Sequence, residues 1–506
     1  MKNWINCIVV LIISHFTFAC GPWYPYGEEI RFSLFTPSIF IDKGYSPFNY
    51  SADIYGYSEQ LRPEEDPNSI LWNAYCKNTP NITDTYLAVY ELSASDLNDK
   101  NSPNTFVQYL HQNNDRATIE YLKFAKSCTP FSQVTYDPWE RKGDHLKKQR
   151  NKKIKAALKK CNTENEESLK KRYAYLAIRL AYYADNESKA NSIYAKYFAH
   201  EKADVIDYWA LYFKLCFVNS SPERNVALAQ IFEKCPTKRF AVSSLFDREI
   251  SIEKTLASAS SNREKGNVIV MYALREPNRS LSHVQQLAKI DPENPQMSFL
   301  LLREINKVED WVLTPKYNLF PPSMYGDYYT PEQKDQYEAR VSSDTQYALE
   351  FANWLKGVSF QNKNTRFIQQ LGSAYLHQIG GYQTIAKAQL LTIETHNNIK
   401  VNHLKDQIEL LFKVAAAKNE NWITNDKNSI LLQAYTPSNY SNFLFAIARE
   451  AEYNKQTSLA ACLFSRLNST PEYSEITENW SESEAWKAPN KVTNLYGDFF
   501  TNYFFS

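Results

Sequence analysis

The stretch LAIRLAYYADNESKANSIY, residues 176–194, decides the fold that we expect of this chain. Its apolar residues recur three or four positions apart on both sides of Ala184-Asp185-Asn186, as they do on one face of an amphipathic α-helix. The polar residues Asp185 and Asn186 are typical of a tight turn. The stretch therefore predicts two helices that are joined as a hairpin.

Three other segments repeat this pattern of apolar residues around a short turn, and they lie at 288–295, 371–388 and 445–464. A lone helix pair leaves one apolar face exposed, and a neighbouring pair covers it. The four segments resemble helix pairs of the tetratricopeptide type, in which small residues let two helices approach and a large residue fills the gap. The resemblance implies a mainly α fold, an irregular α-solenoid of helix hairpins with a concave surface.

The composition agrees with a helical core and excludes some functions. Of 506 residues, 43% are hydrophobic, which is enough for a sizeable core, and only 12 are glycine. Scarce glycine argues against barrels, sandwiches and phosphate-binding loops, because these need backbone positions with positive φ. The net charge of +1 gives no overall attraction to nucleic acid, so we expect no nucleic-acid partner.

Prolines and aromatic residues divide the chain into helical and non-helical parts. Residues 20–100 are rich in both, so we expect an extended segment that docks its rings on the helical body. A second run of this kind, at 311–331, predicts a loop between two helical halves. The expected organisation is a signal peptide at 1–19, the extended segment at 20–100, helical repeats at 101–310, the loop at 311–331, a second helical repeat region at 332–470 and a tail at 471–506.

The N-terminus has the form of a secretory signal, with Lys2, a short apolar core and a small residue before Cys20. Ala19-Cys20 resembles the lipobox of bacterial lipoproteins, whose cysteine carries the lipid, although Thr17 and Phe18 depart from the usual pattern. We therefore expect an exported protein of the cell envelope, in the outer membrane or periplasm, that contacts the membrane only through a lipid on Cys20. The alternative is a secreted protein that is cleaved near the same place.

The string CGPWYPYGEEIRF, residues 20–32, resembles uncharacterised envelope proteins of Bacteroidetes. That group includes SusD-like lipoproteins, which bind glycans and also combine lipidation with helices of the tetratricopeptide type. The present chain lacks the loops rich in Gly and Asn that such proteins have. The resemblance implies a glycan-binding lipoprotein as the alternative function.

No arrangement of residues points to catalysis. The chain has no nucleophile elbow, no dinucleotide fingerprint and no phosphate-binding loop. His200-Glu201 is not followed by a second histidine at the spacing of a zinc hydrolase, and His396 and His403 lie two helical turns apart, about 10 Å along a helix axis. We therefore expect no enzymatic activity, no cofactor and no metal site.

Two candidate binding surfaces follow from the sequence. The first is aromatic and consists of Trp23, Tyr24, Tyr26, Tyr317, Tyr325, Tyr328 and Tyr329, whose rings, if exposed, stack on sugars or anchor a protein. The alternative is that these rings pack against the helices. The second surface is basic and consists of Lys147, Lys148, Arg150, Lys152 and Lys153. It is suited to an anionic polymer or to lipid headgroups, and the alternative is an ordinary solvated helix face.

These observations predict a non-catalytic scaffold, anchored in the envelope, whose helical array binds a protein or peptide. The alternative is a glycan-binding lipoprotein that uses the aromatic loops.

Overall fold

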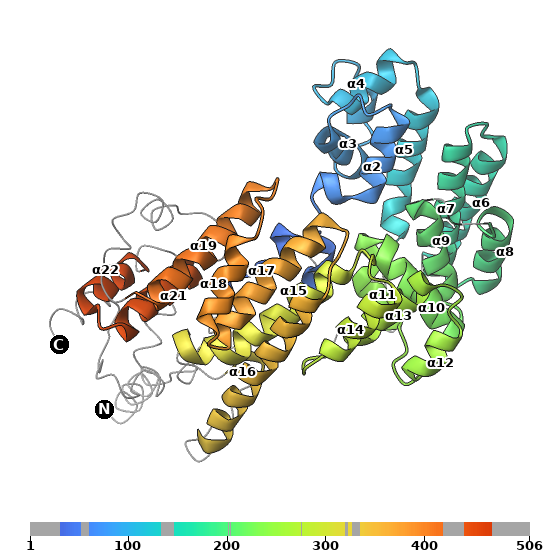
Figure 1. Ribbon diagram of the computed structural model, residues 1–506. Coiled ribbons are helices and arrows are strands. Elements are labelled where there is room, and N and C mark those ends of the chain that lie inside the picture. Colours follow the sequence, from blue (N-terminus) through green and yellow to red (C-terminus); the bar gives the residue numbers. More distant parts are fainter. Residues whose placement is uncertain are drawn as a thin grey trace, which may run out of the picture.

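The computed structural model describes residues 31–51, 60–132, 146–200, 202, 204–274, 276–318, 322–325, 334–417 and 440–467. Within these ranges every regular element is a helix and no β-strand occurs, which confirms the prediction of a mainly α fold (Figure 1). None of the helices in this part of the chain is long and apolar enough to cross a membrane.

The helices follow one another with short connections. The first group comprises α2 (Pro67–Tyr75), α3 (Ile82–Tyr90), α4 (Thr105–Gln112), α5 (Arg116–Cys128), α6 (Lys147–Thr163), α7 (Glu167–Tyr183), α8 (Glu187–Tyr197), α9 (Val205–Leu215), α10 (Pro222–Lys234), α11 (Arg239–Leu245), α12 (Ile252–Ala257), α13 (Asn262–Ala273) and α14 (Leu281–Ile290). The second comprises α15 (Met297–Val308), the π-helix η8 (Glu309–Asn318), α16 (Lys334–Gly357), α17 (Lys363–Ile379), α18 (Gln383–Leu391), α19 (Ile399–Ala415), α21 (Tyr440–Tyr453) and α22 (Thr457–Leu467). Short 3-10 helices are η2 (Pro37–Ile39), η3 (Lys43–Phe48), η4 (Pro63–Glu65), η5 (Asp96–Asn98), η6 (Thr129–Phe131), η7 (Pro236–Lys238) and η9 (Ser323–Tyr325).

Helices that are neighbours in the sequence pack against each other. Among the pairs in contact are α7 with α8, α14 with α15, α17 with α18 and α21 with α22. These four pairs are the hairpins that the sequence predicts, and they are confirmed. Further contacts, such as α7 with α9 and α10 with α13, join successive pairs into an array.

One type of turn recurs in this array. Its central residue has positive φ and is Asn114 after α4, Asp185 after α7, Gly381 after α17 and Lys455 after α21. In the α7–α8 turn the N–H of Asp185 donates to the carbonyl of Tyr182 at 3.0 Å, and the N–H of Asn186 donates to the carbonyl of Ala181 at 3.0 Å. The other three turns have the same pair of hydrogen bonds, which is the Schellman motif that ends many helices.

The predicted extended segment at 20–100 is wrong over its second part, because α2 and α3 lie inside it. The prolines of this region suggested broken helices. Pro67, however, occupies the first turn of α2, where a missing N–H costs nothing, and the Asp66 side chain caps that turn. Asn81 caps α3 in the same way. Residues 67–90 therefore belong to the helical array.

Residues 31–51, which we call the strap, have no α-helix and are covered by the helices of both groups. The rings of Phe32, Phe35, Tyr45, Phe48 and Tyr50 are buried. Tyr45 stacks on Phe299 of α15 with ring centres 4.7 Å apart, and Phe48 meets the edge of Phe232 of α10 at 5.1 Å. In Figure 1 the strap is the dark blue segment beside α15 and α17. It connects the first group of helices with the second.

The predicted loop at 311–331 is also wrong at its start, because residues 309–318 form the buried π-helix η8. Pro315 lies inside this helix, and a proline there had suggested a break. Side chains of η8 instead accept hydrogen bonds from polar groups of the strap. The Thr314 hydroxyl accepts a hydrogen bond of 2.9 Å from the N–H of Phe32. Contacts between residues far apart in the sequence thus keep this segment helical.

Candidate functional site

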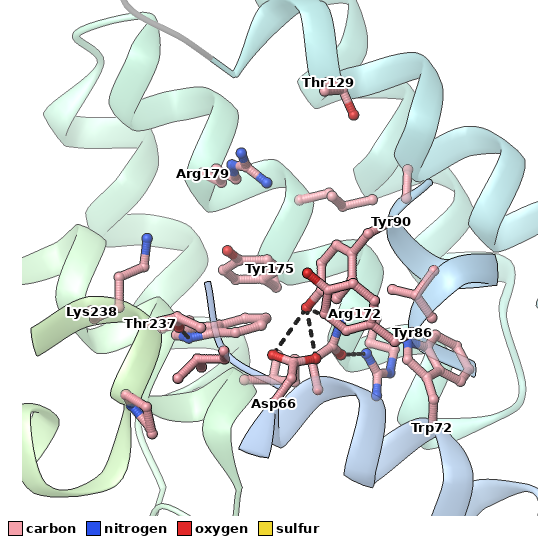
Figure 2. Close-up of a pocket in the computed structure, with 18 of the residues that line it drawn as sticks. Asp66, Trp72, Tyr86, Tyr90, Thr129, Arg172, Tyr175, Arg179, Thr237 and Lys238 are labelled. Atoms are coloured by element: carbon pink, nitrogen blue, oxygen red, sulfur yellow. Dashed lines mark hydrogen bonds between the residues drawn. The ribbon is translucent and has the colours of Figure 1, made fainter. Parts of the chain in front are cut away.

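A cavity of about 550 Å³ lies where the first helices meet α7 and the corner between η7 and α11 (Figure 2). Its walls combine rings, aliphatic side chains and cations from α2, α3, α5, α7, α9 and η7. The aromatic residues that line it include Trp72, Tyr86, Tyr90, Tyr121, Tyr175 and Trp209. This volume falls in the range of small-molecule and peptide side-chain pockets. No sequence pattern had pointed to this site.

The wall formed by α2 and α7 holds a buried arginine. The Arg172 guanidinium lies 3.8 Å from the centre of the Trp72 ring and donates a hydrogen bond of 2.6 Å to the amide oxygen of Asn68. Burial lowers the pKa of Arg172. No carboxylate of a described residue lies within 4.0 Å of this guanidinium. The ring and the amide therefore stabilise a cation that has no ionic partner among the described residues.

The one carboxylate in the cavity wall, Asp66, is already engaged. It is buried and accepts hydrogen bonds from the N–H of Ser69 at 2.8 Å and from the Tyr90 hydroxyl at 3.1 Å. Burial, and then the charge of Asp66, hold the pKa of Tyr90 well above its usual value. The phenol thus remains a donor, and Asp66 fixes both the start of α2 and the orientation of the Tyr90 ring.

On the opposite side of the cavity lie two further cations, Arg179 of α7 and Lys238 of η7 (Figure 2). Burial, followed by repulsion from Arg179, lowers the pKa of Lys238 to about 8. The Lys238 ammonium lies 4.9 Å from the centre of the Tyr212 ring and 5.2 Å from that of Phe213. In the described part of the chain no carboxylate comes within 4.0 Å of either cation.

The cavity therefore has an excess of positive charge. Among the residues that the structure describes, Lys126, Arg172, Arg179 and Lys238 line it together with the single carboxylate of Asp66. Other polar groups of the wall are paired within the protein. Gln60 donates to the Tyr86 hydroxyl at 2.7 Å, and the Trp209 indole donates to the Thr237 hydroxyl at 3.2 Å. Rings and cations are left to contact a ligand.

A second, smaller cavity of about 310 Å³ lies on the other side of Arg172. Here Lys171 is paired with acidic side chains, because its ammonium is 2.8 Å from a carboxylate oxygen of both Asp204 and Asp207. His200 lies 3.3 Å from the other oxygen of Asp207. These pairs fasten α7 to the start of α9, so we assign them a structural role.

Tyr317, a residue of the predicted aromatic surface, is buried. This ring is 3% exposed, packs 4.9 Å from the ring centre of Phe32, and its hydroxyl donates to Glu450 at 2.8 Å. The strap and α21 cover it, so its assignment to a binding surface is wrong. Trp23, Tyr24, Tyr26, Tyr328 and Tyr329 lie outside the described residues, as does Cys20, and of Tyr325 only the backbone, in η9, is described.

The predicted basic surface is narrower than expected. Lys147, Lys148 and Lys152 are exposed on α6, but Arg150 is 2% exposed and donates to the carbonyl of Phe131 at 3.0 Å. Arg150 is four residues before the buried Ile154 and lies on the same helix face, which faces the core. Lys153 is partly buried, with its ammonium 5.5 Å from the ring centre of Phe124 on α5. Arg150 therefore does not belong to a binding surface.

The histidines considered for a metal site are His200, His396 and His403. His396 bonds to the amide oxygen of Asn364 at 2.9 Å, and burial lowers the pKa of His403. Across the described ranges, no cluster of three or more His, Cys, Asp or Glu side chains has the arrangement of a metal site.

The cavity has one sequence signal that could have been used. Arg172 and Arg179 are seven residues apart, two helical turns, in an otherwise apolar stretch of α7. Burial of a charge costs free energy, so two cations on one face of a buried helix indicate a functional or structural role for that face. The other cavity residues come from distant segments, and their assembly depends on the fold.

Comparisons with protein-family models, curated proteins and solved structures give no match for this chain. Its class is therefore defined by architecture: a mainly α protein of sequentially packed helix pairs.

Proposed function

We propose that this protein is a non-catalytic helical scaffold that binds a segment of a partner protein or peptide in the cavity between α2, α3, α5, α7 and α9. The single observation that supports the proposal is the composition of the cavity wall. Trp, Tyr and Arg are the residues that contribute most to protein–protein binding, and all three gather there around an open volume.

A peptide suits this wall better than a sugar does. Leu61, Val89 and Leu122 line the cavity beside the rings and offer contact to an apolar side chain. A sugar needs many hydrogen bonds to its hydroxyls, yet Asp66 and Gln60 already bond to neighbouring tyrosines. The remaining polar groups are mainly cations.

Glycan binding is the second candidate, and one observation favours it. Tyr86 and Tyr90 lie side by side, with ring centres 4.9 Å apart, at the edge of the cavity. Adjacent rings of this kind offer a platform on which a sugar ring can stack. A glycan would use this platform without entering the apolar part of the cavity.

We extend the proposal to the architecture and location of the protein. The Schellman turn that recurs at Asn114, Asp185, Gly381 and Lys455 supports an array of hairpins of the tetratricopeptide type. Export and a lipid anchor at Cys20 rest on residues 1–20 of the sequence alone.

The test is to block the cavity without disturbing the core. Thr129 is an exposed C-cap residue of α5 that lines the cavity, and Thr392 is an exposed C-cap residue of α18 that does not. The full chain and the variants Thr129→Trp and Thr392→Trp are immobilised and exposed to envelope proteins, their peptides and a glycan array. We expect about tenfold weaker binding of the captured protein or peptide to Thr129→Trp only.

Equal binding to both variants would place the binding site elsewhere and contradict the proposal. Retention of glycans without any protein or peptide would replace it with the glycan-binding alternative.

A further inference from the structure

We propose that the segment held in the cavity presents a carboxylate to Arg179 and Lys238 and an adjacent apolar side chain to the rings. This inference rests on the proposed function and adds the chemical class of the ligand. A free C-terminus that ends in an apolar residue has both groups on one residue, and an Asp or Glu next to an apolar residue has the same chemistry.

The two cations lie on one side of the cavity, and no residue that the structure describes supplies a counterion to them. Arg179 projects from α7 and Lys238 from η7, and both side chains line the same side of the cavity (Figure 2). In the part of the chain that the structure describes, neither has a carboxylate within 4.0 Å. Like charges that lie together at a cavity wall are stabilised by an anion from outside the protein.

Among the described residues, the carboxylate that could compete for that position is unsuited to it. Asp66 is the single carboxylate among the described residues of the wall, and its oxygens accept hydrogen bonds from Ser69 and from the Tyr90 hydroxyl. These bonds fix it to the start of α2. The charge of Arg179 and Lys238 therefore remains available to a ligand.

Arg172 contributes to the field without offering a contact of its own. Its guanidinium is stacked on Trp72 and bonded to Asn68. It is buried and keeps its charge inside the wall, where the low dielectric lets it act over a longer distance than a surface cation does. Arg172 thus adds to the positive field of the cavity, and Arg179 and Lys238 are the cations that we expect an anion to contact.

The rest of the wall determines what must accompany the carboxylate. Tyr90 and Trp72 lie across the cavity from the two cations (Figure 2). Val89 and Leu122 also line the cavity. An apolar side chain that enters between them removes apolar surface from water. A bare inorganic anion would leave this surface wet, which is why the cavity favours an anion joined to an apolar group.

The experiment compares peptides that differ only in the terminal charge. N-acetylated hexapeptides without Asp or Glu, ending in Leu, Phe or Tyr, are titrated into the full chain as free acids and as C-terminal amides. A third arm has amides with one Glu next to the last residue, and a fourth uses oligogalacturonate. We expect the free acids to bind about tenfold more tightly than the amides.

Variants identify the cations. Arg179→Met with Lys238→Met, and Lys238→Met alone as a milder change, should remove the difference between acid and amide, whereas Lys238→Arg should retain it. The matched control is Lys147→Met with Lys148→Met, which removes two exposed cations of α6 that do not line the cavity. Thermal unfolding of each variant confirms that it is folded.

Each outcome has one meaning. Preference for the third arm over plain amides supports the carboxylate and assigns it to a side chain. Equal binding of free acids, plain amides and Glu-containing amides would overturn this inference and leave peptide binding intact. Binding of no peptide in any arm would overturn the proposed function as well, and binding of oligogalacturonate alone would assign the cations to an acidic glycan.

Discussion

The carboxylate of Glu309 accepts a hydrogen bond of 2.8 Å from the backbone N–H of Leu34, which lies 275 residues earlier in the chain. The same carboxylate accepts bonds from the N–H of Phe35 at 3.2 Å and from the Tyr375 hydroxyl at 3.1 Å. It is buried, and burial raises the pKa of Glu309 above its usual value. One side chain of the π-helix therefore joins the strap to α17.

Replacing this carboxylate should destabilise the whole protein. In Glu309→Gln an NH₂ group replaces one carboxylate oxygen. At least one of the groups that donate to Glu309 then faces another donor and loses its acceptor. We therefore expect the free energy of unfolding to fall by about 3 kcal/mol. Urea unfolding followed by circular dichroism measures the loss. Glu91→Gln, at an exposed glutamate that ends α3, is the control and should change stability by less than about 0.5 kcal/mol. An equal effect of both substitutions would contradict the role of Glu309.

The hairpin turns predict a stabilising substitution. Asp185 has a φ of 49°, a conformation that costs a residue with a side chain about 1 kcal/mol and glycine almost nothing. Asp185→Gly should therefore raise the free energy of unfolding by about 0.5 kcal/mol, after the extra entropy that glycine gives the unfolded chain. Glu187→Gly, two residues later in the first turn of α8, should lower it. A loss of stability with Asp185→Gly would show that the side chain makes a contact that outweighs the backbone strain.

Binding of an acidic peptide should depend on pH through Lys238. Its pKa of about 8 in the free protein means that the ammonium is charged below pH 8 and becomes neutral above it. A bound carboxylate favours the charged form and raises the pKa, so affinity is full at pH 7 and falls by about tenfold toward pH 10. Titration calorimetry with an N-acetylated free-acid peptide measures this decline. Lys238→Arg should show a flat profile, and a decline that persists in this variant would assign the titration to another group.

The predicted lipid anchor is tested by one labelling experiment. Cells that produce the full chain are supplied with a radioactive fatty acid, and the label should enter the wild-type protein and be absent from Cys20→Ala. Cys76→Ala, at a buried cysteine of the helical body, should retain the label. Label in the Cys20→Ala protein would exclude this cysteine as the attachment site.

The local parts of the fold were predictable because they depend on neighbours in the sequence. Apolar spacing around Ala184-Asp185-Asn186 predicts the α7–α8 hairpin, and the Schellman hydrogen bonds of Asp185 and Asn186 confirm it. The proline signal was less informative. Pro67 begins a helix and Pro315 lies inside one, and in each case the deciding contact is made by a side chain, Asp66 or Thr314.

Contacts over long distances were beyond prediction for a physical reason. The burial of Tyr317 depends on Phe32 and Glu450, which approach only after the strap and α21 have docked. The cavity likewise combines Asp66, Arg179 and Lys238 from three segments of the chain. The burial of Arg150, by contrast, was predictable from the sequence. Arg150 is four residues before Ile154, so both lie on the same, buried face of α6.

Photo-crosslinking at the edge of the cavity tests the central claim, that the ligand enters there, most directly. Phe240 is 43% exposed and lines the cavity, whereas Tyr382 is 53% exposed at the start of α18, far from it in the sequence and outside its wall. Each is replaced by benzoylphenylalanine in the full chain, in cells that produce it. We expect a defined crosslinked partner from position 240, lost with Thr129→Trp, and none from position 382. Crosslinks from position 382 and none from position 240 would contradict it.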